Sequence, residues 1–183
     1  MKTKLPHTID SGHGEVIIFK EIIHEPDGDK IIFEGQVQPN CGPPMHVHYK
    51  QDEHFHVLQG TMAYQIPDKK VGYLKVGESV TFLKNTPHKF WNSGEDELIL
   101  NTWAKPANNM VLYLSTLYGA TQELKTAKLN AFDGVYLTIM YKNEYDILEI
   151  PSLMKKIIIP ITFFIGKLIG KYKKFDEKPI PIK

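Results

Sequence analysis

Short β-prone runs, separated by turn-forming residues, extend from about residue 14 to residue 105 of this 183-residue chain. The breaks include Pro-Asp-Gly-Asp at 26–29, Gly60 and Gly77, residue types that favour turns for steric reasons. Many short and evenly spaced strands predict an all-β sandwich or barrel. The runs are residues 15–23, 30–38, 46–49, 53–59, 61–66, 79–83, 88–92 and 98–104.

The composition is that of a globular domain without a strong charge field. Hydrophobic residues make up 42% of the chain, enough for a core, and the formal net charge is +1. This balance gives no reason to expect a nucleic-acid partner. All 22 basic residues are Lys, and the absence of Arg disfavours a highly anionic substrate, because Arg is the usual bidentate clamp for such groups.

Two further features bear on the cellular compartment. Cys41 is the single cysteine, which excludes an internal disulfide and fits a reducing environment. Residues 1–6 lack the apolar run of a signal peptide. We therefore expect a cytoplasmic protein.

After the last of these runs the pattern changes from strand-like to helical. Residues 108–118, 132–145 and 151–174 carry apolar residues at helical spacing, most clearly in the third segment. Pro160 is expected to kink or divide that segment, and residues 175–183 to form a mobile basic tail.

The chain is thus predicted to consist of a barrel over residues 1–105 and a helical extension over residues 106–183. On a period of 3.6 residues the third helical segment has one broad apolar face, and Ile159 and Phe163 depart from it. The face contains Leu153, Met154, Ile157, Ile158, Ile161, Phe164, Ile165, Leu168, Ile169 and Tyr172.

This apolar face is expected to be buried against another surface, because a large exposed apolar patch is unfavourable in water. Residues 157–169 would form a helix of about 20 Å, too short for the roughly 30 Å of a bilayer interior. Packing on the barrel or on a second subunit is favoured, and a homodimer is expected. The alternative is contact of residues 153–172 with an anionic membrane surface, since residues 151–183 hold eight Lys against two acidic residues.

Three histidines and one glutamate stand at spacings that can converge on one metal ion. His46 and His48 are two residues apart, so on a strand they point to the same face, with Cα atoms roughly 6.8 Å apart. Glu53 and His88 would complete the set from neighbouring strands. Imidazole and carboxylate together suit one divalent transition metal ion, whether Fe, Mn, Ni, Co, Cu or Zn.

A second pair, His54 and His56, competes for this assignment. If Glu53 points into the barrel, strand alternation turns both of these histidines outward. We therefore expect the first set to form the metal site and the second pair to lie at the surface or at an interface.

The segments that carry these residues resemble the two motifs of the cupin superfamily. The segment from Gly42 to Gly60 has glycine, His-x-His, glutamate and a closing glycine at the spacing of the first motif. The segment from Gly77 to Asn92, with His88 in register, is similar to the second motif. Leu83 stands where that motif has proline and Asn85 where it has a turn glycine, and Asn tolerates the left-handed backbone of such a turn.

The resemblance implies a fold, a site and a class of activity. The fold would be all-β, a double-stranded β-helix (jelly-roll) barrel, here with added C-terminal α-helices. His46, His48, Glu53 and His88 would be the metal ligands, and Glu53 would also serve in catalysis as a proton acceptor. The activity would be a mononuclear metal-dependent, dioxygenase-like reaction on a small molecule, with aromatic molecules favoured. A metal-dependent isomerase or lyase on a sugar-like or keto substrate, and a non-catalytic small-ligand-binding cupin, are the alternatives.

Residues for the wall of a substrate pocket are suggested in part by strand parity. Phe55 and Val57 share the parity of Glu53, while Phe90 and Asn92 share that of His88, and the other candidates do not rest on that argument. An apolar and aromatic wall is typical of a small organic ligand, although core packing explains any single one of these residues better. Cys41 is interpreted as a packed loop residue rather than a redox partner of the metal. The candidates are Phe55, Val57, Tyr64, Phe82, Phe90, Asn92 and Trp103, with Phe33 and Met45 considered beside them.

Overall fold

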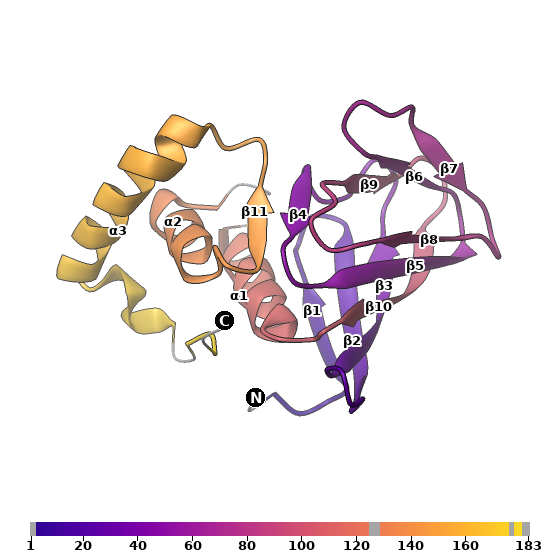
Figure 1. The fold of residues 1–183 in the computed structure, drawn as a ribbon, viewed down its shortest axis with the longest axis horizontal. Helices are drawn as coiled ribbons and strands as arrows, with labels where there is room; N and C mark the ends of the chain where they lie inside the picture. The colour runs from indigo at the N-terminus through magenta and orange to yellow at the C-terminus, as the bar shows by residue number, and fades with distance from the viewer. Residues whose placement is uncertain (1–2, 125–128, 176–177, 181–183) are drawn as a thin grey trace.

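The structure is a computed structural model that describes residues 3–124, 129–175 and 178–180. Two layers of β-strands face each other, and helices pack beside them (Figure 1). The large sheet has the strand order β1-β2-β3-β10-β5-β8, and the opposing wall consists of β7-β6-β9 and β11-β4. The strands are β1 (His7–Asp10), β2 (Glu15–Ile23), β3 (Lys30–Val37), β4 (His46–His48), β5 (Asp52–Gln59), β6 (Met62–Gln65), β7 (Gly72–Leu74), β8 (Ser79–Phe82), β9 (Lys89–Asn92), β10 (Leu98–Lys105) and β11 (Tyr145–Ile147).

The large sheet buries one face because its strands alternate in polarity. In β3, Ile31, Phe33, Gly35 and Val37 are buried, whereas the alternate residues are half-exposed. The antiparallel register places Phe33 and Phe55 on either side of Thr102. Three neighbouring strands therefore present these side chains to the same interior.

A backbone bridge closes the opposing wall. His46 of β4 and His88, directly before β9, form an antiparallel bridge with N-to-O distances of 2.9 and 2.8 Å. The bridge joins β11-β4 to β9-β6-β7 into one layer. The predicted fold class is confirmed: two facing antiparallel layers form a double-stranded β-helix, or jelly roll, with α-helices added at the C-terminus.

Helix α1 (Met110–Leu124) packs against β1 of the large sheet, and α2 (Ala131–Met140) packs on α1 (Figure 1). Buried residues of the sheet and of both helices form one continuous cluster, so the extension and the barrel share a hydrophobic core. The cluster includes Ile9, Phe19, Ile31 and Phe33 from the sheet and Met110, Val111, Tyr118, Tyr136, Leu137 and Tyr141 from the extension.

Strands β1, β7 and β11 are not among the predicted runs. The helix predicted over residues 132–145 is wrong in its last part, because α2 ends at Met140 and residues 145–147 form β11. Tyr145 pairs with His48 and Ile147 with His46, so β11 is stabilised by a strand far earlier in the chain. A three-residue strand has no periodicity that local sequence could reveal.

The third helical segment is divided next to Pro160, as predicted. Met154–Ile158 form a π-helical turn (η1), Ile159–Leu168 form α3, and Lys171–Lys174 form a short 3-10 helix (η2). Pro160 lies in the first turn of α3. Proline lacks a backbone N–H and is tolerated in a first turn, and the wider π turn lies directly before it.

The broad apolar face predicted for this segment does not pack on the barrel. The buried side of α3 is instead formed by Ile159, Phe163 and Gly166, which turn toward α2 and the core. Ile159 and Phe163 are the two residues that depart from the predicted face. Tyr172 of the predicted face packs against the core, whereas the rest of that face points away and stays exposed, from 44% at Met154 to 70% at Leu168.

Part of the C-terminal tail lies against the start of α1. Ile180 donates its backbone N–H to Asn109 Oδ1 at 2.8 Å and accepts from Asn109 Nδ2 at 2.9 Å. Residues 176–177 and 181–183 lie outside the described residues, and the mobility of the tail stays a prediction. Within the described ranges, none of the helices combines the length and hydrophobicity needed to cross a bilayer.

Candidate metal centre

The structure brings the four predicted ligand residues together on the side of the barrel that faces the helices. His46, His48, Glu53 and His88 each offer one ligand atom, and these atoms all lie within 4.8 Å of one another. Glu53 Oε2 is 3.2 Å from His88 Nε2 and 3.5 Å from His48 Nε2. Such a cluster has the dimensions of a site for one ion.

Backbone pairing explains why the four side chains meet. His46 and His48 share one face of β4, and the bridge to His88 places the third imidazole beside them. Glu53 comes from β5 of the large sheet, so its carboxylate approaches from the opposite layer. His54 lies on the other face of β5, as strand alternation predicted.

The second histidine pair, His54 and His56, forms hydrogen bonds at the outer surface of the large sheet. His54 Nδ1 and His56 Nδ1 lie 2.8 Å from Thr81 Oγ1 and Ser79 Oγ, respectively. The ring of His54 also stacks on Trp103, with centroids 5.3 Å apart. Both histidines therefore point away from the cluster of four.

Hydrogen bonds to backbone carbonyls orient two of the imidazoles. His46 Nδ1 donates to Pro44 O and His88 Nδ1 donates to Thr86 O, each at 2.9 Å. A nitrogen that donates to a carbonyl must carry the proton, so Nε2 of each neutral ring presents a lone pair. Phe82 fixes the ring of His88 further by stacking on it, with centroids 4.0 Å apart.

These polar atoms fit a bound cation. His88 Nε2 and Glu53 Oε2 face each other at 3.2 Å with lone pairs, an arrangement that needs a proton or a metal ion between the two atoms. His48 Nδ1 is buried and lacks a hydrogen-bond partner among the described residues. Three imidazoles and a carboxylate are also the ligand types that divalent transition metals prefer.

Burial and mutual proximity shift the pKa values toward the metal-binding forms. Burial, together with His48 and His88, lowers the pKa of His46 to about 3. Burial alone would raise the pKa of Glu53, but the surrounding imidazoles outweigh it and lower that pKa to about 2. At neutral pH, His46 is therefore neutral and Glu53 is ionised, as a metal ligand must be.

The stability of the metal-free protein is expected to fall as the pH is lowered from about 7 to about 4. The unfolded chain protonates His46 near its ordinary pKa of 6.5, whereas the folded chain does so only near 3. The unfolded state thus binds more protons in this window, and Glu53 adds to the loss between 4.5 and about 2. Thermal unfolding of chelator-treated protein across this pH range measures the effect. His46→Gln should make the decline shallower, and an unchanged slope would contradict the assignment.

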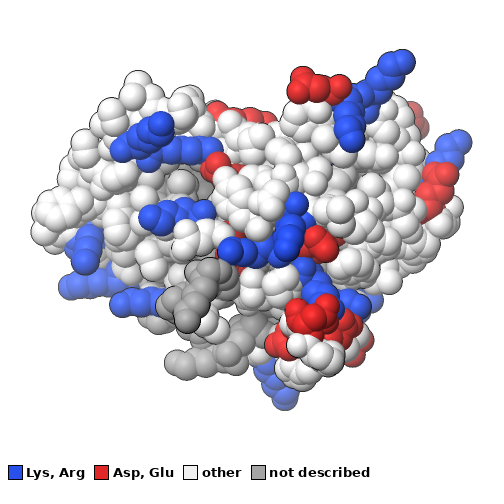
Figure 2. Space-filling view, in the orientation of Figure 1, with Lys and Arg blue, Asp and Glu red and all other residues white. Residues whose placement is uncertain are grey.

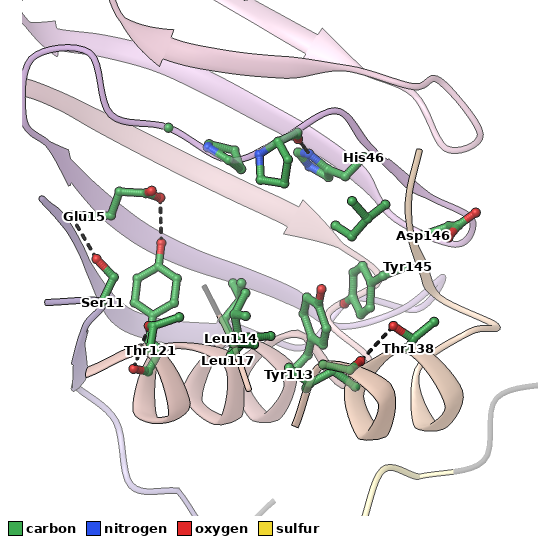
Figure 3. A pocket seen from close by; sticks show the side chains of 18 of the residues that line it. Ser11, Glu15, His46, Tyr113, Leu114, Leu117, Thr121, Thr138, Tyr145 and Asp146 are labelled. Carbon is green, nitrogen blue, oxygen red and sulfur yellow. Dashed lines mark hydrogen bonds between the residues drawn. The ribbon is translucent and has the colours of Figure 1, made fainter. Parts of the chain in front are cut away.

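His46, His48 and Glu53 lie in the wall of an apolar cavity of about 650 Å³, and His88 lies behind them. The barrel forms one side of this cavity and helices α1 and α2 form the other, with their side chains pointing toward the barrel (Figure 3). Its apolar lining includes Phe33, Phe55, Phe90 and Leu100 from the barrel and Leu114, Leu117, Val135 and Leu137 from the helices.

The predicted pocket residues divide into two groups. Phe55 and Phe90 line the cavity, as does Phe33. The others lie elsewhere. Val57 and Phe82 are buried in the barrel core, and Tyr64 packs against them. Asn92 is fully buried and donates hydrogen bonds to Val37 O and Asp96 O, and Trp103 lies on the outer face of β10. Met45 is not part of the lining either.

Three tyrosines from the extension, Tyr113, Tyr118 and Tyr145, line the cavity and were not predicted. Tyr145 of β11 packs edge-on against His48, with centroids 5.2 Å apart, and its hydroxyl accepts from Gln51 Nε2 at 3.1 Å. Tyr113 of α1 stacks on Tyr145 at 4.3 Å, and its hydroxyl points toward the barrel (Figure 3). Burial raises the pKa of Tyr113 to about 12, so this hydroxyl stays protonated and can donate a hydrogen bond.

The cavity also has a polar end away from the four ligands. Tyr118 donates a hydrogen bond to Glu15 Oε2 at 2.9 Å (Figure 3), and burial raises the pKa of Glu15. Ser11 accepts from the backbone N of Glu15 at 3.2 Å. An apolar space with a polar group at each end suits an elongated and mainly apolar molecule.

Comparison with known proteins agrees with this geometry. Residues 33–104 match the family model of the cupin domain. The probable oxidoreductase virH of Hypocrea virens is 32% identical over 95 residues, which cover 47% of this chain and 43% of that protein. The oxidoreductase iacF of Pestalotiopsis fici is 31% identical over 107 residues, covering 49% of this chain and 48% of that protein. The matched region thus spans less than half the length of either relative.

Among solved structures, KdgF from Halomonas sp. is similar at 17% identity and a TM-score of 0.48, covering 57% of this chain and 92% of that one. The family match spans the strands from β3 to β10 and contains all four ligand residues. The segment from residue 33 to residue 104 is therefore a cupin domain by its sequence match and its antiparallel double-stranded β-helix, and its three histidines and one glutamate form a candidate metal site.

Proposed function

We propose that the protein is a mononuclear metal-dependent oxidoreductase, dioxygenase-like in its chemistry, that acts on an elongated and mainly apolar small molecule. The observation that carries this proposal is the convergence of four candidate ligand atoms, three of them from residues that line an apolar cavity of about 650 Å³. The names of the two oxidoreductases that resemble this chain support the reaction class.

The residues divide the work by position. His46, His48, Glu53 and His88 would hold the ion, which when bound would supply open coordination positions for oxygen and substrate. The phenylalanines of the barrel and the leucines of α1 exclude water from the cavity. Tyr113 would orient the substrate through its protonated hydroxyl, and Glu53, ionised at neutral pH, would accept a proton.

The test combines elemental analysis with oxygen consumption. Protein loaded with iron or manganese should consume oxygen with at least one member of a panel of apolar and aromatic molecules, and zinc-loaded protein should not. Turnover by the zinc form without oxygen would instead indicate a metal-dependent isomerase or lyase. Binding of panel members without turnover by any metal form would indicate a non-catalytic binding protein, and either result would overturn the proposal.

Tyr113→Phe is expected to leave the metal content unchanged and to lower kcat/KM roughly fivefold to tenfold, the value of one hydrogen bond. The hydroxyl that is lost points into the cavity, but it touches none of the four ligand residues. The matched control is Tyr136→Phe, because Tyr136 is buried in the shared core and does not line the cavity. Equal kinetics for the two variants would remove Tyr113 from the proposed role.

A further inference from the structure

Along η1 and α3 runs a continuous apolar surface that no other described residue covers. We name this surface the apolar ridge. Its side chains lie opposite the buried side of α3, and they are between 44% and 70% exposed. Folded monomers rarely leave such a patch in water without a function for it. The ridge consists of Leu153, Met154, Ile157, Ile158, Ile161, Phe164, Ile165, Leu168 and Ile169.

Lysines flank the apolar ridge without acidic neighbours in the same segment. Residues 151–175 hold six Lys and contain neither Asp nor Glu. Lys155 and Lys174 are neutralised by Asp146 and Asp133, at 2.6 and 2.7 Å. In Figure 2, blue side chains gather over the part of the molecule where Figure 1 places α3 and η2.

Two of the remaining lysines neighbour the ridge along the helix, each three residues after one of its members, Leu153 or Phe164. Lys156 and Lys167 are eleven positions apart, which is close to three helical turns, so they lie on the same flank of the helix. Both are exposed, and neither has an ion-pair partner among the residues that the structure describes. An apolar stripe with free cations along its flank is the pattern of a helix that lies in a membrane interface.

We propose that the apolar ridge docks on an anionic lipid surface, with α3 lying parallel to the membrane plane. A second copy of the chain fits the charges less well. A two-fold contact between two ridges would bring the same lysines of both copies together, with no carboxylate in residues 151–175 to offset them. Anionic headgroups offset this charge, while the acyl boundary accepts the apolar side chains.

The apolar ridge is continuous with the lining of the cavity. Met154 and Ile158 belong both to the ridge and to the cavity wall. Docking would therefore bring the wall of the cavity to the lipid boundary. One consequence, which rests on the proposed function, is that the substrate is an apolar molecule that partitions into membranes.

The experiment is co-sedimentation of the full chain with lipid vesicles, which requires no substrate and no bound metal. The protein should sediment with vesicles that contain phosphatidylglycerol and stay in solution with pure phosphatidylcholine, and added salt should weaken the binding. Lys156→Gln with Lys167→Gln should lower the partition coefficient about tenfold or more. Ile161→Asp with Phe164→Asp should abolish binding.

The matched control is Val76→Asp, because Val76 is an equally apolar side chain, 62% exposed, in the turn between β7 and β8 of the barrel. This variant should bind as the unchanged protein does. Circular dichroism melts would check that the variants keep their fold. We expect them to do so, because the altered side chains are exposed.

Several results would overturn the proposal. They are equal binding to both kinds of vesicle, absence of binding to anionic vesicles at low salt, and full binding by the Ile161→Asp, Phe164→Asp variant. If sedimentation velocity shows a dimer that the Ile161→Asp, Phe164→Asp variant dissociates, and the protein does not bind vesicles, the ridge is buried by a second copy of the chain. Vesicle binding without any oxygen consumption would leave the docking intact and count against the proposed function alone.

Discussion

Glu53→Ala is expected to lower the metal content of the purified protein at least tenfold. The carboxylate stands 3.2 Å from His88 Nε2 and 3.5 Å from His48 Nε2, so its removal opens one side of the ligand cluster and leaves three imidazoles, two of them buried, without an anion. His48→Ala should have a similar effect. Elemental analysis by mass spectrometry after dialysis against a defined metal mixture measures the change.

His54→Ala serves as the matched control. His54 neighbours Glu53 in sequence, but it points to the outer surface, where it contacts Thr81 and Trp103. Its loss should leave the metal content unchanged. If His54→Ala removed the metal and Glu53→Ala retained it, the ion would have to lie on the opposite face of β5.

Gly42→Ala is expected to lower the free energy of unfolding by about 3 kcal/mol, because strain and a steric clash act together. Gly42 has a φ of +153°, which L-residues rarely adopt. A Cβ atom there would collide with Phe90 O and lie 2.8 Å from Trp91 Cα, backbone atoms of β9 that cannot move independently. Since His88 directly precedes β9, metal affinity should fall as well. Urea-induced unfolding, with and without metal, measures both effects.

Gly77→Ala separates the two causes. Gly77 also has a positive φ, +86°, but a Cβ there would meet no atom within 4 Å. Only backbone strain is added, so the loss should be about 1 kcal/mol and metal affinity should stay unchanged. Equal losses of unfolding free energy in the Gly42→Ala and Gly77→Ala variants would show that the steric clash with β9 does not contribute to the destabilisation.

Much of the barrel could be read from local sequence because strand alternation is a local property. The burial pattern of β5 follows its letters: Glu53, Phe55 and Val57 are buried, and His54 and His56 are half-exposed. Asn85, which stands where the second cupin motif has a turn glycine, was predicted to adopt a left-handed backbone, and its φ of +66° in the turn before His88 agrees. Trp103 was predicted for the pocket but lies on the outer face, because β10 pairs it with His54, which faces outward on β5.

The prediction for α3 shows the limit of this reasoning. Helical periodicity identified a broad apolar face, and it assumed that the widest apolar face is the one that packs. The helix instead packs through Ile159, Phe163 and Gly166, since α2 and the core are what these residues meet. Which side of an apolar helix is buried depends on the neighbouring element, and the helix sequence holds no information about that element.

The sequence by itself determined the ligand types, their spacing, the face of each strand that carries them and the class of the fold. These features follow from chain chemistry and from a two-residue period that needs no distant partner. Only the tertiary structure decided that β11 pairs with β4, that Tyr113 and Tyr145 line the cavity, and that the apolar ridge stays exposed. Each of these depends on contacts between segments far apart in the chain, and such contacts leave no local pattern because their stability comes from packing rather than from propensity.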